Sequence, residues 1–506
     1  HPTGGSDPEE FTHLNGMLFF RANNGAAGEE LWISDGTNAG TKEVKNINPT
    51  GGSQPDEITV GNGVVFFKAN DGTNGDEVWV SDGTDAGTMM VMDINPGGSS
   101  EPGNFVYANG LLFFVANDGT NGAELWVSDG TQGGTEMVKD IYTTGGSDPE
   151  HLTGYNGEVY FSAENDADGR ELWKSDGTEA GTQMVKDISV MGLGSSDPAG
   201  FAVSSGTLFF QAKDSDGIEL WRTDGTTAGT QLVKNINPMG NGNPAHLTDM
   251  DGVLFFSASD GPSETELWKS DGTANGTVRV KNINPTIGSN PSELTAINGI
   301  LYFSATDGVT GYELWKSDGT EAGTVLVKDI NPLGNSNAAP NFITAYHGKI
   351  YFVSADGTHG REIWVTDGTE LNTSLVADIN LVGSGDPLHL TVSGTTMFFQ
   401  ANDGISGHEL WKLETPNSIF SLAEREQIKI FPNPVADKVN IQIENPAKGN
   451  IDVQLLNAIG QTIDFGLFNP VEEEIQLNTS GLSDGLYFIR LVNDKGEVLV
   501  RKIIKE

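Results

Sequence analysis

Short runs of apolar residues alternate with polar, glycine-rich segments along most of the chain, and helical periodicity is absent. Residues 104–141 illustrate the pattern. The apolar run 104–108 ends at an Asn-Gly pair, which favours a two-residue hairpin turn before a second run at 111–116. Further runs follow at 124–127 and 137–141, each after a turn. The pattern predicts four short antiparallel strands, which is the content of one propeller blade.

The same unit recurs along the chain with a nearly constant period. Nine tryptophans mark one position in successive units, 47 to 49 residues apart, and eight of them lead into a Ser/Thr-Asp-Gly-Thr turn. Such a period is typical of repeat architectures, in which each unit buries its apolar faces against its neighbours. We expect each tryptophan to fill the gap between adjacent blades, with its N–H bonded to a neighbouring carbonyl; an exposed platform for sugars is the alternative. The nine are Trp32, Trp79, Trp126, Trp173, Trp221, Trp268, Trp315, Trp364 and Trp411.

Counting the predicted strands leaves the number of blades open. The first three strands of the unit occur nine times and the fourth eight times. Residues 1–8 copy the loop 48–55, which follows a fourth strand, so we expect a further strand ahead of residue 1. Nine blades, or eight with an incomplete closing blade, both fit. A closed ring is favoured over an open solenoid because it leaves no exposed sheet edge.

The predicted fold class is therefore all-β and covers two domains. Residues 1–412 form a large β-propeller of eight or nine four-stranded blades, each of about 47 residues. Residues 413–427 are a polar linker. Residues 428–506 contain about seven short strands with a different spacing and predict a small immunoglobulin-like β-sandwich.

Composition excludes several classes of function. The formal net charge is −42, and such a surface repels the phosphates of nucleic acids, so no nucleic-acid partner is expected. The chain has no cysteine and therefore no disulfide or thiolate metal site. No stretch approaches the roughly 18 apolar residues of a transmembrane segment. Because the first residue is His1 and not Met, we expect that a leader or a longer N-terminal region has been removed.

A glutamate stands two residues before every tryptophan of the repeat. Such a ring of carboxylates could bind metal or act in catalysis, but hairpin geometry offers a structural interpretation. If the turn is centred on residues 35–40, Glu30 lies opposite Lys45, and the same rule pairs Glu124 with Lys139. We therefore expect cross-strand ion pairs of about 0.2–1 kcal/mol each. In the Asp-Gly-Thr turns, we expect Asp to bond its own turn backbone and Gly to supply a positive φ.

Two loops ahead of these glutamates place oxygen ligands at alternate positions, in part like a calcium-binding loop. Neither loop has the full 12-residue spacing, and most other units keep a lone Asp-Gly pair. An ordinary Asp-Gly hairpin turn on an acidic surface is therefore the alternative. Ca²⁺ is the one cofactor that the sequence suggests. Its candidate ligands are Asp166, Asp168 and Glu171 in one loop, and Asp214, Asp216 and Glu219 in the other.

Catalytic motifs are scarce in this sequence, and no catalytic residue is assigned. His-Glu-x-x-His, Gly-x-Ser-x-Gly and phosphate-binding loops do not occur. Among eight histidines, His151 and His246 take equivalent positions just before Leu-Thr. The eighth unit departs most from the repeat, which drift between repeats explains as well as chemistry does. Its departures are Tyr346, His347, Tyr351, His359 and Arg361.

The repeat resembles the bacterial family named for its ELWxxDGTxxGT signature. Residues 124–135 carry the signature in full, and counterparts recur over residues 8–412, although the eighth unit keeps it only in part. The resemblance implies a secreted or surface-exposed repeat protein and a propeller fold. It implies no defined activity.

The C-terminal segment resembles the type A sorting domain of the type IX secretion system of Bacteroidota. The motifs that carry this resemblance are residues 431–434, 456–461, 482–488 and 501–505, in family order. The resemblance implies a Gram-negative bacterium, recognition by the outer-membrane shuttle and sortase of this machinery, and secretion or attachment to the outer cell surface. The sorting-signal residues that it implies are Pro432, Asn433, Pro434, Gly460, Gly485, Tyr487, Lys502 and Lys505.

Together these features favour a secreted, non-catalytic binding or adhesion protein, with extracellular glycan as the leading partner. This ligand class is inferred by analogy from the ring fold and the export route. One alternative is a propeller polysaccharide lyase or hydrolase, which a paired, perturbed carboxylate or a His/Tyr/Arg cluster would favour. The other is a structural subunit of a surface layer or filament, which assembly without ligand would favour.

Overall fold

The computed structural model describes residues 4–189, 194–261, 265–332, 338–413, 428–431, 434–443, 451–457, 462–468, 474–483, 485–493 and 498–505. The chain divides into two compact units, His1–Leu413 and Glu414–Glu506. Both are built of β-strands. Among the described residues, helical structure is confined to the single 3₁₀ turn η1 (Gln132–Gly134).

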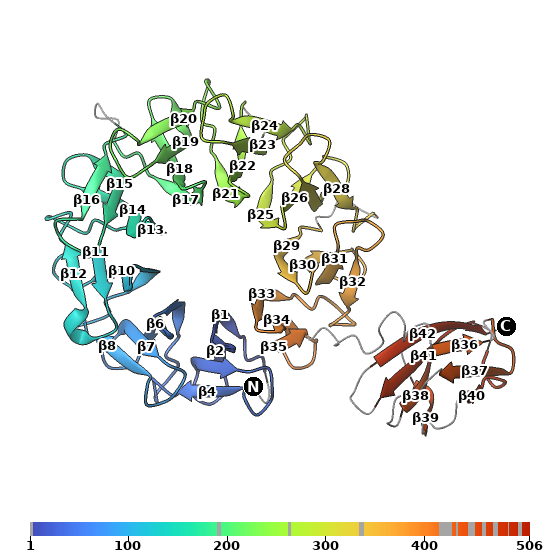
Figure 1. Ribbon diagram of the computed structural model, residues 1–506. Helices are drawn as coiled ribbons and strands as arrows, with labels where there is room; N and C mark the ends of the chain where they lie inside the picture. The colour runs from blue at the N-terminus through green and yellow to red at the C-terminus, as the bar shows by residue number, and fades with distance from the viewer. Residues whose placement is uncertain are drawn as a thin grey trace. The chain divides into compact units, whose positions relative to one another are not determined.

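The first unit is a ring of nine sheets, which are its blades (Figure 1). Eight blades have four antiparallel strands in sequence order, and the ninth has three among the described residues. The structure confirms the predicted all-β propeller and sets the number of blades at nine.

The first strand of each blade borders the centre of the ring and lies beside the first strand of the next blade (Figure 1). We call these nine strands the inner wall. They are β1 (Glu9–Leu14), β5 (Asp56–Gly61), β9 (Gly103–Ala108), β13 (Glu150–Tyr155), β17 (Ala199–Ser204), β21 (Ala245–Met250), β25 (Ser292–Ile297), β29 (Asn341–Tyr346) and β33 (Leu388–Ser393).

The remaining strands follow outward from the inner wall in chain order. The second strands are β2 (Met17–Asn23), β6 (Val64–Asn70), β10 (Leu111–Asn117), β14 (Glu158–Asn165), β18 (Thr207–Asp214), β22 (Val253–Ser259), β26 (Ile300–Thr306), β30 (Lys349–Ala355) and β34 (Thr396–Asn402). The third strands are β3 (Glu29–Ser34), β7 (Asp76–Ser81), β11 (Ala123–Ser128), β15 (Gly169–Ser175), β19 (Gly217–Thr223), β23 (Thr265–Ser270), β27 (Tyr312–Ser317), β31 (Arg361–Thr366) and β35 (His408–Leu413). The fourth, outermost strands are β4 (Lys42–Lys45), β8 (Met89–Met92), β12 (Glu136–Lys139), β16 (Gln183–Lys186), β20 (Gln231–Lys234), β24 (Val278–Lys281), β28 (Val325–Lys328) and β32 (Ser374–Ala377).

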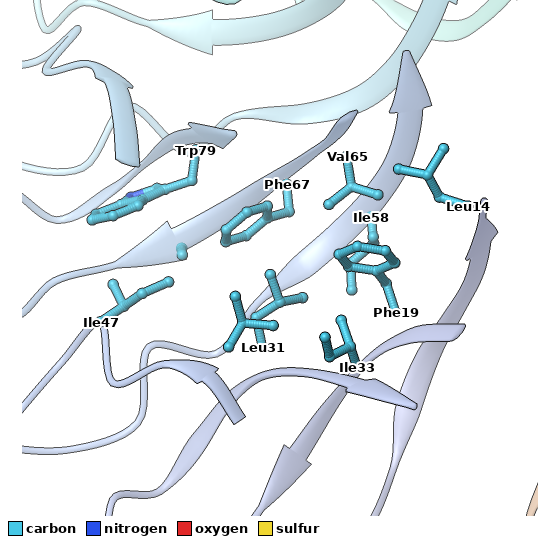
Figure 2. Close-up of a cluster of buried hydrophobic side chains, with 11 residues drawn as sticks. Leu14, Phe19, Leu31, Ile33, Ile47, Ile58, Val65, Phe67 and Trp79 are labelled. Atoms are coloured by element: carbon cyan, nitrogen blue, oxygen red, sulfur yellow. The ribbon is translucent and has the colours of Figure 1, made fainter. Parts of the chain in front are cut away.

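The hydrophobic cores lie between neighbouring blades. The second strands read as continuous apolar runs because both faces of each sheet are covered; Leu112, Phe113 and Phe114, for example, are all fully buried. Figure 2 shows one such core, in which Leu31 of the first blade packs with Phe67 of the second. Each core therefore joins two blades, and no blade buries its apolar side chains alone.

The repeated tryptophans belong to these cores, as predicted. Seven of them are only 5–7% exposed, and Trp79 packs against the apolar side chains of the preceding blade (Figure 2). In three blades a lysine of the preceding fourth strand lies over the indole ring, as Lys139 lies 5.9 Å from the centre of Trp173. The expected N–H to carbonyl bond is wrong for eight tryptophans, whose indole nitrogens have no acceptor in reach among the described residues. Trp411 alone donates, to the Ala401 carbonyl at 3.0 Å.

The ring closes where blade nine meets blade one. Phe398 of blade nine packs against Leu18 and Phe20 of blade one. The backbone N–H of Asp7 donates to the carbonyl of His408 at 3.0 Å. The preference for a closed ring over an open solenoid is confirmed.

The second unit is a sandwich of two sheets. Side chains from both sheets, among them Val439, Ile441, Val453 and Ile489, form one fully buried core. The connector predicted at 413–427 lies outside the described residues, except for its first residue. One sheet has the order β36 (Ile428–Phe431), β37 (Lys438–Ile443), β40 (Glu474–Asn478); the other has β39 (Thr462–Phe468), β38 (Ile451–Asn457), β41 (Gly485–Asn493), β42 (Val498–Lys505).

Candidate functional site

The repeated glutamates are buried and form hydrogen bonds that stabilise the blades from inside. In blade three, Glu124 is fully buried and accepts the backbone N–H groups of Ile141, Tyr142 and Ser147 at 3.2, 3.3 and 2.9 Å. The Ser147 hydroxyl donates to it at 2.5 Å. The carboxylate thus ties the loop that leaves the fourth strand to the third strand. The same role falls to Glu30, Glu77, Glu171, Glu219, Glu266, Glu313 and Glu362.

The predicted Glu–Lys ion pairs are wrong. Leu125, and not Glu124, lies opposite Lys139, because a bulge shifts the register between the third and fourth strands. The bulge places one extra residue, Val138, on β12, and this residue moves Lys139 out of register with Glu124. Lys139 instead reaches the next blade, where its ammonium donates to the carbonyl of Thr182 at 3.0 Å.

The Asp-Gly-Thr turns are architectural, as predicted. Asp35 accepts the backbone N–H and the hydroxyl of Thr37 at 2.8 and 2.7 Å, and Gly36 has a φ of +86°. The Thr37 hydroxyl in turn accepts the N–H of Gly40 at 2.9 Å. These bonds to Thr37 hold the pKa of Asp35 below its ordinary value, and the same holds at seven equivalent aspartates.

The buried repeated glutamates and the turn aspartates together predict that the ring is most stable near pH 4.5. Burial raises the pKa of Glu171 and Glu313 to about 7, so their stabilising effect is complete below about pH 4.5 and is lost as the pH rises through 7. The turn aspartates act in the opposite sense, because their pKa values are lowered. Their stabilising effect is lost only as the pH falls below about 4. We expect Tm to fall between about pH 5 and 8, and the Glu171→Gln/Glu313→Gln variant to fall less steeply. A Tm that rises to pH 8 would contradict this.

The two predicted calcium loops do not assemble their three carboxylates. Glu171 and Glu219 are buried and accept backbone N–H groups inside their blades. Asp166 accepts the hydroxyls of Thr143 and Thr144. In the part of the chain that the structure describes, no group of three or more His, Cys, Asp or Glu side chains is placed to hold a metal. Without the glutamates the predicted ligand sets are incomplete, and calcium binding stays a prediction.

The remaining ligands of both sets belong to their hairpins. Asp168 accepts the side-chain amide of Asn165 at 3.1 Å. Asp214 accepts the backbone N–H of Asp216 at 2.8 Å, and burial raises its pKa. These contacts fit the alternative of an Asp-Gly hairpin turn on an acidic surface.

Each strand of the inner wall has a left-handed backbone position at the same place. The second residue of every inner-wall strand has a φ between +52° and +65°, at a bulge in the pairing with the second strand. Eight of the nine residues are not glycine, and this conformation costs a non-glycine residue roughly 1–2 kcal/mol. Strain that the surrounding structure maintains is often found at functional sites. The nine are Glu10, Glu57, Asn104, His151, Gly200, His246, Glu293, Phe342 and His389.

Threonines two residues further along hold these bulges in place. The Thr153 hydroxyl donates to the carbonyl of His151 at 3.1 Å, and the same bond recurs in five other blades. In blades six and eight the threonine also donates to the inner wall of the next blade, and in blade one Thr12 donates to the Ile58 carbonyl at 2.8 Å. The hydroxyls thus satisfy carbonyls that the bulge releases from the ladder and fix the positions of the nine side chains.

Several wall side chains reach the neighbouring blade. Glu57 accepts the N–H of Phe105 at 3.3 Å. The ring of His389 lies 5.9 Å from that of Phe342 and 5.7 Å from that of Phe11. The side-chain amide of Asn104 donates to the Pro149 carbonyl at 3.4 Å. Asn104, His151, His246 and Glu293 are exposed. One side of the wall is therefore partly apolar, while the rest presents hydrogen-bonding groups.

Charged groups gather at the wall of blades one and two. Arg21 forms an ion pair with Glu9, and Lys68 lies 3.2 Å from the carboxylate of Asp56. Burial and the negative charge of Asp56 raise the pKa of Glu10. Burial also raises the pKa of Asp56, but the hydrogen bond and charge of Lys68 outweigh it and leave this pKa lowered. The pKa values of Glu10 and Asp56 are thus shifted in opposite directions.

The departures of the eighth repeat do not form one cluster. Tyr346, at the end of β29, contacts the rings of His347 and Tyr351 and donates its hydroxyl to the Thr395 carbonyl. Arg361 bonds Asn341 at the opposite end of the same strand, 2.9 Å away. His359 lies in the next hairpin and pairs with Asp356 at 2.6 Å.

The predicted sorting-signal residues are spread over the second unit. Pro432, Asn433 and Gly460 lie outside the described residues, as does the side chain of Lys502. Tyr487 is buried and donates to the Ser483 carbonyl at 2.9 Å. Lys505 is buried on β42 and forms a parallel bridge with Val435. Pro434 and Gly485 are exposed beside this core.

Comparison with known families assigns the second unit. Residues 429–506 match the family model described as the secretion system C-terminal sorting domain. They are a type IX sorting domain. This sorting domain is the signal for export, so the protein is secreted or displayed on the cell surface. The described residues contain no helix long and apolar enough to span a membrane.

Solved structures similar to this chain are remote. No curated protein matches the sequence significantly. Puromycin hydrolase is 14% identical over 69% of this chain and 58% of its own, with a TM-score of 0.36. The β-propeller domain of the Trilobed protease from Pyrococcus furiosus is 10% identical over 74% and 98%, with a TM-score of 0.35. The chain spans about six-tenths of puromycin hydrolase, and similarities of this size carry no inference about activity.

Proposed function

We propose that this protein is a secreted, non-catalytic binding protein whose inner wall takes up extracellular glycan at the cell surface. The sorting domain supplies the location. The inner wall supplies the surface, because it borders the centre of the ring and its bulge position carries different side chains from blade to blade (Figure 1).

The bulge position of the inner wall differs from the other repeated positions of the blade, and this contrast supports the proposal most directly. The glutamate, the tryptophan and the Asp-Gly-Thr turn repeat around the ring and are taken up by packing and hydrogen bonds within it. At the bulge, the side chain changes among Glu, Asn, His, Phe and Gly, while the strained backbone stays the same. A constant frame that presents variable side chains is the arrangement expected of a binding surface.

The chemistry of the wall suits a carbohydrate. Sugar hydroxyls both donate and accept hydrogen bonds. On the protein side, the exposed Asn104, His151 and His246 offer donors and acceptors, and the exposed Glu293 offers acceptors. The C–H faces of a sugar pack against apolar rings, which Phe11 and Phe342 provide on the other side of the wall. An acidic surface favours neutral or cation-bridged glycans over polyanionic ones.

A glycan-array screen of residues 1–506, run with Ca²⁺ and with a chelator, tests this proposal. We expect selective binding of one class of neutral glycan, and loss of binding with chelator would support the calcium prediction. Analysis of the bound glycans for shortened products tests the hydrolase alternative, for which Glu10 and Asp56 are the carboxylates to replace. If no glycan binds in either condition, glycan binding is overturned. Concentration-dependent assembly without ligand would favour the structural subunit.

A further inference from the structure

Apolar side chains are exposed at one end of blades eight and nine. They stand in the loop that follows β32 and in the hairpin between β34 and β35. Leu381, Val382 and Ile405 are 84%, 98% and 92% exposed, and together they line a cavity of about 590 Å³. An exposed apolar patch with polar surroundings often marks a site of interaction.

Other blades show that the fold does not require these apolar side chains. Thr73 of blade two corresponds to Ile405, and both form the same turn bond, from the backbone N–H to the aspartate two residues earlier, at 2.8 and 2.9 Å. The loop after the fourth strand also forms with threonine at both apolar positions, as Thr143 and Thr144 of blade three show. The exposed apolar surface of blades eight and nine is therefore free to serve an interaction.

A polar cavity of about 220 Å³ adjoins the apolar one, because residues 380–383 line both. Asp378 lines the polar cavity, and its Oδ1 atom is buried without a hydrogen-bond partner among the described residues. A buried acceptor that lacks a donor is costly, so a donor from a bound partner gains from pairing with it. The corresponding oxygen lacks a partner in four other blades, at Asp93, Asp140, Asn235 and Asp329. Blade eight adds the apolar side chains beside it.

The charges beside the two cavities are mainly negative. Asp403 lines the apolar cavity, and Asp378 the polar one. His359 also lines the polar cavity, where its hydrogen bond to Asp356 raises its pKa and the negative charge of Asp378 adds to this effect. The whole chain carries a formal net charge of −42. Such a field attracts cations, and it repels anionic lipid headgroups and a second copy of the chain.

We propose that blades eight and nine bind a cationic segment of a partner protein, in which an aliphatic residue stands next to lysine or arginine. The aliphatic side chain fills the cavity between Leu381 and Ile405, and its cationic neighbour donates to Asp378 in the adjoining cavity. Burial of the apolar side chain supplies affinity, and the charge selects a basic partner. This surface is separate from the inner wall and does not depend on glycan binding.

Selection of random peptides displayed on phage against the immobilised full chain tests the proposal. We expect the enriched peptides to carry an aliphatic residue beside lysine or arginine. A synthetic copy should bind Leu381→Thr/Val382→Thr/Ile405→Thr with Kd raised by about tenfold or more. This variant should fold, because other blades carry threonine at these places. The matched control Met239→Thr removes a side chain of blade five that is 94% exposed, and its Kd should be unchanged.

The variant Asp378→Asn tests the cationic contact separately. Asn235 stands at the corresponding place in blade five, so this variant should fold. We expect Kd for the enriched peptide to rise by about fivefold or more. A peptide with glutamine in place of its lysine or arginine should bind Asp378→Asn and the unmodified chain equally. Asp93→Asn, the same change in blade two, should alter neither affinity.

Four results would overturn the proposal. The first is a selection that enriches no basic, aliphatic peptide. The second is equal affinity of the triple threonine variant and the unmodified chain, which shows that the peptides bind elsewhere on the acidic surface. The third is a dimer of the unmodified chain that the triple variant loses, which makes a second copy the occupant. The fourth is binding to phosphatidylcholine vesicles that the triple variant loses, which makes a lipid surface the occupant.

Discussion

Replacement of Glu124 by alanine is expected to lower the free energy of unfolding of the ring by about 3–5 kcal/mol. The change leaves the N–H groups of Ile141, Tyr142 and Ser147 without their acceptor inside the blade, and each unsatisfied buried group costs roughly 1–3 kcal/mol. A surface Glu–Lys pair, as the sequence predicted, would contribute only about 0.2–1 kcal/mol. The size of the loss therefore distinguishes the two roles.

The measurement is a denaturant titration of matched variants. Glu124→Gln keeps the shape and one accepting oxygen, so we expect a smaller loss than for alanine. Glu409→Ala, in the partly exposed blade nine, is also expected to cost less, because water can reach the groups that it leaves. Equal stability of Glu124→Ala and the unmodified chain would show that the hydrogen bonds of this carboxylate do not stabilise the blade.

Removal of residues 428–506 is expected to abolish export while leaving the ring folded. The sorting domain is a separate compact unit with its own core, so its loss removes the signal and none of the blade contacts. In a bacterium that has this secretion system, we expect the truncated ring to stay inside the outer membrane. The measurement is the fraction of protein that external protease digests on intact cells, together with the amount released into the medium.

The matched control for export changes the ring and keeps the sorting domain. His151→Gly lies on the inner wall, where Gly200 of blade five already occupies the equivalent bulge, so this variant should be exported normally. Surface display of the truncated chain at the normal level would show that the signal lies elsewhere.

The blade itself could be predicted because its signals are local. The Asn-Gly turn after residue 108, the apolar run 111–116 and the Asp-Gly-Thr turns each act within a few residues, and all of them are present in the structure. The tryptophans were assigned to the gaps between blades because a large apolar side chain at one position of every repeat has few other places to be buried. The sorting domain could be identified because four motifs follow one another in the family order.

The role of the repeated glutamate could not be predicted, because its partners depend on a bulge in the neighbouring fourth strand. The pairing rule assumes a regular hairpin, whereas the extra residue Val138 moves Lys139 out of register with Glu124. The buried carboxylate instead accepts backbone N–H groups of the loop that follows the fourth strand. No residue in that short stretch is a strong bulge signal.

The inner wall was missed for a related reason. Glutamate and phenylalanine rarely adopt a positive φ, so Glu57 or Phe342 gives no local indication of a bulge. The available signal was weak: a variable residue recurs just before Leu-Thr or Ile-Thr, as at His151 and His246. Its meaning depends on the threonine that bonds the bulge carbonyl, which only the folded blade shows.

The most direct test of the account is the affinity of the array-selected glycan for two matched variants. One variant, His151→Gly/His246→Gly, removes two exposed inner-wall side chains at positions where glycine fits the backbone. The other, Glu136→Ala/Gln183→Ala, removes two exposed side chains from the outermost strands β12 and β16. If the inner wall binds the glycan, titration will show Kd raised by about tenfold or more in the first variant and unchanged in the second. Equal affinity of both variants, or loss confined to the second, would contradict the account.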